Sequence, residues 1–313
     1  MRQSSTPARP LRIGSRGSPL ALIQARQVQQ ALALACGLAS EAIEIKVIHT
    51  SGDKVQDRPL ADAGGKGLFT KEIEEALLSD AIDFAVHSSK DIPALLPPGL
   101  TLAGFLPRED PRDALVGGKA KTLRALPRNA LVGTSSPRRQ ALLKRTRPDL
   151  RIVPLRGNVE TRLRKIEAGE MDAGVLAVAG LKRLGLFSAT AVALEVEEFL
   201  PAVGQGAIAI ETRAEDEAAR RLAAAIDDSD THTALAAERA FLAALGGSCR
   251  TPIAGHARVR GDSVTFRGLL AKPDGSDAVE AARQGRRADA AALGVDAGHE
   301  IKSRAGPDFF VED

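Results

Sequence analysis

The chain has 313 residues, of which 44% are hydrophobic and 27% charged, and its 43 basic residues almost balance its 40 acidic ones. This length exceeds what one hydrophobic core usually supports, so we expect a globular protein of two or three domains. No segment approaches the roughly 20 consecutive apolar residues of a membrane-spanning helix. The small net charge and the absence of Trp and Tyr disfavour a nucleic-acid binder with stacking platforms. We therefore expect neither a membrane nor a nucleic acid as partner.

Short β-rich runs alternate with helical patterns along most of the chain. The sequence first predicts strands at 11–13, 43–48 and 82–86 and helices at 19–35 and 71–79. The alternation resumes after a Pro- and charge-rich stretch at 107–112, with strands at 130–132, 151–155 and 173–178 and helices at 137–145 and 159–168. We interpret these patterns as two α/β lobes joined by a hinge at 107–112.

Each lobe contains a strand that leads directly into a capped helix. Ser18 and Ser136 are residue types preferred at a helix N-cap, and each is followed by proline at the first helical position, where a missing N–H costs nothing. The free backbone N–H groups and the positive end of the helix dipole form an anion site. The guanidinium groups that strengthen these two sites are Arg16 in the first lobe, and Arg138 and Arg139 in the second.

A third strand-to-helix junction carries arginines against the helix dipole. Asn158 is the expected N-cap, Arg156 lies just before it, and Arg162 lies near the first turn. Because cations at a helix N-terminus oppose its dipole, a bound anion explains this placement better than helix stability does. Solvated arginines on an exposed helix face are the alternative interpretation.

Polar residues follow the apolar strand at 82–86, at the carboxyl end where α/β proteins commonly place their sites. Asp91 is the candidate acid there, with Lys90 beside it, and a structural aspartate that caps a turn is the alternative. The loop GGKGLFT at 64–70 lacks the spacing of a phosphate-binding P-loop. Its Lys66 belongs either to a lid over a ligand or to a plain surface turn.

The last part of the chain has a different pattern. It contains an Ala-rich helix at 231–245, a Gly-rich turn at 246–249 and strand-like runs at 253–259 and 264–270, and 277–313 is helical in places. These elements predict a smaller α+β domain.

The two cysteines differ in their surroundings. Cys36 lies in an apolar helix and is most simply a small buried side chain. Cys249 lies in the Gly-rich turn beside Arg250, whose charge favours the thiolate, so Cys249 is the reactive candidate. The five histidines have no metal-ligand spacing, and we expect no metal.

Eight motifs, taken in order, resemble those of porphobilinogen deaminases (hydroxymethylbilane synthases). They are RGSPLAL at 16–22, GGKGLFTKE at 64–72, AVHSSKDIP at 85–93, GTSSPRRQ at 133–140, LRGNV at 155–159, LAVAGLKRLG at 176–185, LPAVGQGA at 200–207 and GGSC at 246–249. Each motif alone is weakly specific, whereas the ordered set is highly specific. In two departures, Asp62 stands where some bacterial relatives have lysine, and Ser248 replaces a glycine before the cysteine.

The resemblance implies an α/β fold of two lobes similar to type II periplasmic binding proteins, plus a smaller α+β C-terminal domain. The chain is implied to cross back into the first lobe near 207–212. The implied domains are 1–106 with 207–226 for the first lobe, 112–200 for the second lobe, and 229–313 for the domain that carries the cofactor cysteine.

The resemblance also implies an activity, that of a deaminating transferase in tetrapyrrole biosynthesis. Such an enzyme joins four porphobilinogen molecules, each with loss of ammonia, on a dipyrromethane cofactor that a thioether attaches to Cys249, and releases hydroxymethylbilane. Asp91 is the implied catalytic carboxylate, because a fixed anion stabilises the positive charge that develops as ammonia leaves.

The remaining site residues are implied to bind the acetate and propionate side chains of the pyrroles. Those implied for the cofactor are Lys90, Ser136, Arg138, Arg139, Arg156 and Arg162. Those implied for the substrate are Arg16, Ser18, Gln24, Lys66, Arg183 and Gln205.

A non-catalytic two-lobed module that binds an anionic solute is the main alternative function, because arginine-lined helix starts suit it equally well. Such a module is normally exported, whereas the first ten residues lack the apolar stretch of a secretory signal. A DNA-binding regulator with a similar ligand lobe is a further alternative, although no helix-turn-helix pattern is recognisable before residue 11 or after residue 230. We therefore expect a cytoplasmic enzyme with porphobilinogen as its partner and, from the family, a monomer.

Overall fold

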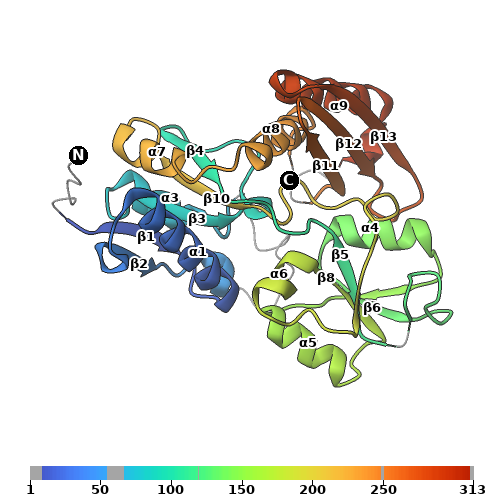
Figure 1. Cartoon of the computed structure of the whole chain (residues 1–313). Coiled ribbons are helices and arrows are strands. Elements are labelled where there is room, and N and C mark those ends of the chain that lie inside the picture. The colour runs from blue at the N-terminus through green and yellow to red at the C-terminus, as the bar shows by residue number, and fades with distance from the viewer. Residues whose placement is uncertain (1–8, 55–66, 119, 248–249, 311–313) are drawn as a thin grey trace. The chain divides into compact units, whose positions relative to one another are not determined.

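The computed structural model describes residues 9–54, 67–118, 120–247 and 250–310 (Figure 1). The chain forms two compact units. One comprises Met1–Val55, Gly65–Arg108 and Ala207–His232, and the other comprises Gln56–Gly64, Glu109–Gly206 and Thr233–Asp313. Each unit has hydrophobic clusters of its own.

The first unit is built on a five-stranded sheet of order β2-β1-β3-β10-β4. Its parallel strands are β1 (Leu11–Ser15), β2 (Ile43–Val47) and β3 (Phe84–Ser88). The inserted strand β10 (Ile208–Arg213) runs antiparallel to β3 and to β4 (Leu100–Phe105). The predicted return of the chain to this lobe near 207–212 is thereby confirmed.

Helices cover both faces of this sheet, because successive side chains of a strand point to opposite faces. Phe84 and Val86 of β3 pack in one cluster with α1 (Pro19–Cys36) and α7 (Glu217–Ala224). Ala85 packs in a second cluster with α3 (Lys71–Leu78). The short elements of this unit include α2 (Ser51–Lys54), η1 (Ser40–Ala42) and η2 (Ser89–Asp91).

The second unit contains a sheet of the same plan, in the order β7-β6-β8-β5-β9. Its parallel strands are β6 (Leu131–Gly133), β7 (Arg151–Val153) and β8 (Ala173–Ala177). The inserted antiparallel strand is β5 (Asp113–Val116), which pairs with β8 and β9 (Ala191–Ala193). The helices of this lobe include α4 (Pro137–Thr146), α5 (Val159–Glu167) and α6 (Val178–Arg183). Both lobes are therefore α/β, as predicted.

The three predicted N-caps are confirmed by side-chain hydrogen bonds at the starts of α1, α4 and α5. The Ser18 hydroxyl accepts from the Ala21 amide at 3.3 Å, and the Ser136 hydroxyl accepts from the Arg139 amide at 3.4 Å. The Asn158 carbonyl accepts from the amide of Thr161 at 2.8 Å. These bonds satisfy N–H groups that have no partner within their own helix.

A three-stranded antiparallel sheet also belongs to the second unit. Its strands are β11 (Ile253–Arg260), β12 (Ser263–Ala271) and β13 (Ala278–Arg286). The helices α8 (Ser229–Ala244) and α9 (Ala290–Arg304) accompany it, as do the turns η3 (Arg287–Asp289) and η4 (Pro307–Phe309). Phe241 of α8 packs on the sheet where Gly268 leaves room, since a Cβ atom there would lie 2.5 Å from the ring. The prediction of a smaller α+β part is confirmed.

Several strands escape prediction from the sequence. The expectation that 277–313 is helical in places is confirmed by α9, whereas strand β13 is not predicted, because its alternation is carried by small alanines and so is weak. The short strands β4, β5 and β9 are not predicted either. The domain boundaries stay a prediction, because the second lobe and the C-terminal elements share one compact unit. The hinge at 107–112 also stays a prediction.

Gly294 of α9 lies against α8, where an added Cβ atom would come within 2.0 Å of the Ala237 carbonyl oxygen. Because backbone cannot move aside easily, we expect Gly294→Ala to lower the free energy of unfolding by roughly 1–3 kcal/mol. Urea unfolding followed by circular dichroism measures this change. The exposed neighbour Ala292→Ser serves as control and should change stability by less than about 0.5 kcal/mol. Equal midpoints for the two variants would contradict the close contact.

Candidate functional site

Several of the predicted site residues that the structure describes form two clusters, one in each compact unit. In the first unit, a cavity of about 70 Å³ lies where the N-terminus of α1 meets the carboxyl end of β3. It is lined by Arg16, Ser18, Leu20, Ala21, Gln24, Phe69, Val86, His87, Ser88 and Asp91. Four of these residues are predicted site residues, namely Arg16, Ser18, Gln24 and Asp91. The fold therefore brings together groups that lie far apart in the sequence.

Asp91 is presented to this cavity by a short turn. It ends η2 directly after β3, and both Asp91 and Lys90 are exposed. The turn is anchored by buried Ser89, whose amide donates to the carbonyl oxygen of Ala207 at 3.0 Å. A rigid sheet thus holds a carboxylate that remains accessible to a ligand.

Gln24 lies on α1 with only 3% of its surface exposed. Its Nε2 atom donates to the Ser88 hydroxyl at 2.9 Å, so the side chain ties α1 to the end of β3. Gln24 therefore holds α1 against β3 and also lines the cavity. Its predicted contact with a substrate stays a prediction.

Arg16 is already engaged by an acid that the sequence analysis does not identify. Its Nε donates to Asp53 at 3.1 Å, its Nη2 also donates to Asp53, and its guanidinium lies 4.0 Å from the centre of the Phe69 ring. Burial opposes ionisation of Asp53, but hydrogen bonds from Arg16 and Thr50 outweigh it and lower the pKa of Asp53. Asp53 follows β2, so the rule that polar residues gather at carboxyl ends of strands is the signal that indicates it.

A buried acidic cluster lies behind the same strand. The Nε2 atom of His87 is 3.0 Å from a carboxylate oxygen of Glu211, and both side chains are almost fully buried. Glu74 of α3 is buried near them, and its pKa is raised by burial and by the charge of Glu211. Glu74 thus retains its proton to higher pH than an exposed glutamate does.

The raised pKa of Glu74 makes stability depend on pH. The native state holds this proton more tightly than the unfolded chain does. Protonated Glu74 therefore contributes its full share to the free energy of unfolding below the ordinary glutamate pKa, and this share is lost as pH rises through the raised pKa of Glu74. Glu74→Gln cannot ionise, and we expect its melting temperature at pH 8 to exceed that of the wild type by about 2–4 °C. Thermal unfolding at pH 5 and pH 8 measures this. The exposed Glu75→Gln is the matched control. A variant that melts below the wild type at both pH values would contradict the assignment.

The cluster of the second unit is organised by a buried carboxylate at the start of β5. Asp113 is 0% exposed, and its carboxylate accepts from Arg138 Nη2 at 2.7 Å and from Arg139 Nη2 at 2.6 Å. The Gln205 side-chain amide donates to the same carboxylate at 3.0 Å. Burial alone would raise the pKa of Asp113, but the charges of Arg138 and Arg139 lower it to about 2. Three predicted ligand residues thus meet on one acid that the sequence analysis missed.

This cluster holds two buried guanidinium groups and one buried carboxylate, which leaves one positive charge in excess. Both arginines also donate to backbone carbonyl oxygens: Arg138 Nη1 donates to that of Leu200 at 2.7 Å, and Arg139 Nη1 donates to that of Val175 at 2.9 Å. Among the described residues, no group accepts a hydrogen bond from the buried Nε of Arg138. Burial lowers the pKa of Arg138, which is the response of an under-neutralised cation. An anionic ligand would supply the missing charge.

The other predicted residues of the second unit lie on neighbouring elements. Arg156 follows β7, and Arg162 of α5 donates from Nε to the Gly157 carbonyl at 2.8 Å. Arg183 ends α6 and donates to the Gly206 carbonyl at 2.8 Å, and burial lowers the pKa of its guanidinium. Lys66 and Cys249 lie outside the described residues, as do Asp62 and Ser248. Their roles stay predictions.

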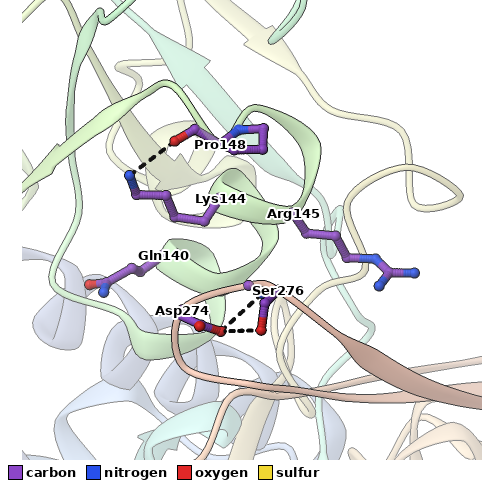
Figure 2. Close-up of a pocket in the computed structure, with 7 residues that line it drawn as sticks. Gln140, Lys144, Arg145, Pro148, Asp274 and Ser276 are labelled. Atoms are coloured by element: carbon purple, nitrogen blue, oxygen red, sulfur yellow. Dashed lines mark hydrogen bonds between the residues drawn. The ribbon is translucent and has the colours of Figure 1, made fainter.

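A larger hollow, of about 790 Å³, lies between the end of α4 and the loop that joins β12 to β13. Figure 2 shows its lining, including Gln140, Lys144, Arg145 and Pro148 of the α4 region and Asp274 and Ser276 of the loop. The Lys144 amine donates to the carbonyl oxygens of Pro148 at 3.3 Å and Leu150 at 2.6 Å, and Asp274 accepts from the Ser276 hydroxyl at 2.7 Å. Lys144, Asp274 and Ser276 are therefore hydrogen-bonded within the protein, and none of the predicted site residues lines this hollow.

Two features are absent from the described ranges. No helix there is long and apolar enough to span a membrane. No group of three or more His, Cys, Asp or Glu side chains there is arranged to hold a metal ion.

Comparison with known proteins then assigns the family. A family model described as "Porphobilinogen deaminase, dipyromethane cofactor binding domain" matches residues 11–221, and its C-terminal domain model matches 232–303. The chain belongs to the porphobilinogen deaminase family. Similar members include the porphobilinogen deaminase of Nitrobacter winogradskyi, 61% identical over 96% of this chain and 95% of that protein, and that of Nitrobacter hamburgensis, 60% identical over the same shares.

Solved structures with a similar arrangement have much lower sequence identity. They include the BvgS periplasmic VFT2 domain of Bordetella pertussis, with a TM-score of 0.40, 18% identity and coverage of 69% of this chain and 86% of that one. YhfZ from Shigella flexneri has a TM-score of 0.36 and 18% identity, covering 74% and 94%. The assignment to the porphobilinogen deaminase family rests on the sequence relatives and not on these structures.

Proposed function

We propose that this protein joins four porphobilinogen molecules head to tail, with loss of ammonia from each, and releases hydroxymethylbilane. Family membership over nearly the whole chain supports this activity. The observation that carries it in the structure is the cavity at the end of β3, where Asp91 meets Arg16, Ser18 and Gln24. One carboxylate beside a cationic anion-binding helix start is the combination that a deaminating reaction on an acidic pyrrole requires.

Arg16 and Ser18 bind the carboxylate side chains of the incoming porphobilinogen. The N-terminus of α1 supplies free backbone N–H groups and the positive end of its dipole to the same place. Gln24 braces this helix against β3. Lys66, Arg183 and Gln205 are the further residues that we assign to substrate binding. The bound substrate is thus oriented by its acids, away from the carbon that reacts.

Asp91 acts at the reacting carbon. Loss of ammonia leaves positive charge on the substrate, and a fixed carboxylate nearby lowers the free energy of that state. The same carboxylate accepts hydrogen bonds from pyrrole N–H groups, which positions the ring for the next bond. Its place on η2, anchored to the sheet through Ser89, keeps it fixed through the reaction.

The residues of the second unit fit a covalently held dipyrromethane, which supplies the primer to which substrate is added. Its acidic side chains match the excess positive charge around Asp113 and the buried Nε of Arg138. We assign the binding of these acids to Lys90, Ser136, Arg138, Arg139, Arg156 and Arg162, and the thioether attachment to Cys249.

Three further features belong to the proposal. The domains are 1–106 with 207–226, 112–200, and 229–313, the last of which carries the cofactor cysteine. The protein acts as a monomer in the cytoplasm, and porphobilinogen is its small-molecule substrate. The porphobilinogen deaminase relatives, which match nearly the whole chain, support the catalytic function and not the non-catalytic solute-binding module.

Intact-protein mass spectrometry tests the attachment of the cofactor. We expect the purified wild type to carry a covalent adduct that is absent from Cys249→Ala, because the thioether needs that sulfur. Cys36→Ala is the matched control and should keep the adduct. An active wild type without added mass, or an adduct lost only with Cys36, would overturn the attachment.

Asp91→Asn tests the catalytic carboxylate. We expect this variant to keep the covalent adduct and to lose roughly 10²–10³-fold in kcat, the usual effect of removing one electrostatic stabiliser of a transition state. Steady-state release of ammonia measures the rate, and the adduct mass serves as the control for assembly. Turnover within about twofold of the wild type would remove Asp91 from the reaction.

A further inference from the structure

The guanidinium group of Arg16 has two edges that can each bind a carboxylate. One edge consists of Nε and Nη2, and the other consists of Nη1 and the second N–H of Nη2. Asp53 takes the first edge, since both Nε and Nη2 donate to it. Within the described part of the chain, no acceptor contacts Nη1. Arg16 also keeps 23% of its side-chain surface exposed, so the ion pair does not remove it from a ligand.

Asp53 is itself held in place. The Thr50 hydroxyl donates to its carboxylate at 2.8 Å, and Thr50 is fully buried. Because these bonds lower its pKa, Asp53 stays ionised at neutral pH. The carboxylate is therefore a fixed anchor for Arg16 and not a mobile counter-ion.

The segment that carries Asp53 is packed against the segment that carries Phe69. The Gly52 amide donates to the Leu68 carbonyl at 2.8 Å, and a Cβ atom on Gly52 would lie 2.4 Å from the Phe69 ring. The Ser51 amide donates to Glu72 at 2.8 Å. The ring of Phe69 then supports the plane of the Arg16 guanidinium, so one ion pair and one stacking contact fix both its direction and its plane.

We propose that Asp53 is a positioning residue for substrate binding: it occupies the Nε edge of Arg16 and so presents the Nη1 edge to a carboxylate of porphobilinogen. This role rests on the proposed function. It differs from a latch in which Asp53 competes with the substrate for Arg16, because the two carboxylates use different edges. Without Asp53, the long side chain of Arg16 must be ordered by the substrate itself.

Kinetics of Asp53→Asn with porphobilinogen test this role. We expect KM to rise roughly three- to tenfold, the cost of ordering one flexible side chain on binding, with kcat within about twofold of the wild type. Asp53→Glu, which keeps the charge, should recover part of the loss. The control is Asp80→Asn, which removes a carboxylate paired with Arg12 and Arg213 in the same unit. Asp80 has a φ of 57°, which asparagine adopts readily, so this variant should fold and keep its KM.

The outcomes separate the possibilities. A KM that falls would establish competition by Asp53 and overturn the proposal, and an unchanged KM in a folded variant would overturn it as well. If Asp53→Asn does not fold, Phe69→Leu tests the alignment of the Arg16 guanidinium, because it removes the stacked ring and leaves the ion pair. An unchanged KM in Phe69→Leu overturns the proposal. A wild type without turnover overturns the proposed function and this role with it, whereas an active wild type confines any failure to Asp53.

Discussion

A single buried carboxylate determines how Arg138 and Arg139 are arranged in the second lobe. The Asp113 carboxylate accepts hydrogen bonds from Arg138, Arg139 and Gln205. Asp113 is the first residue of β5, the strand inserted antiparallel into its sheet. Burying two guanidinium groups is costly unless they are paired, and one carboxylate pairs them only in part. The fold therefore maintains a preformed positive site, whose charge balance an acidic ligand would complete. Removal of Asp113 would leave two unpaired cations in the core, so binding and stability depend on the same interaction.

The two lobes both pair their arginines with an aspartate, but the pairs differ in how deeply they are buried. Each has an inserted antiparallel strand in a five-stranded sheet, and each begins a helix with a serine N-cap beside arginine. In the first lobe, Asp53 pairs with Arg16 near the surface, so the guanidinium keeps an open edge. In the second lobe, Asp113 pairs with Arg138 and Arg139 in the interior. An exposed pair suits a substrate that enters and leaves, whereas a buried pair suits a group that stays bound.

Local sequence rules predicted the features that depend on neighbouring residues. The N-caps Ser18, Ser136 and Asn158 follow from residue type and position, and the parallel strands follow from apolar runs. The partners Asp53 and Asp113 could not be predicted in this way, because each meets its arginine only after the sheet has formed, across 37 and 25 residues respectively. Strand β13 was missed because alanine and glycine carry little of the alternation that identifies a strand.

We propose that the excess buried positive charge around Asp113 is neutralised by the acidic side chains of the cofactor. The most direct measurement is the urea midpoint of the cofactor-loaded protein against that of Cys249→Ala, with Arg138→Leu introduced into both. We expect the loaded protein to unfold at a higher urea concentration, and this difference to shrink when Arg138 is replaced, because binding to the native state stabilises it. Equal midpoints for loaded and unloaded protein, or a difference that Arg138→Leu leaves intact, would contradict it.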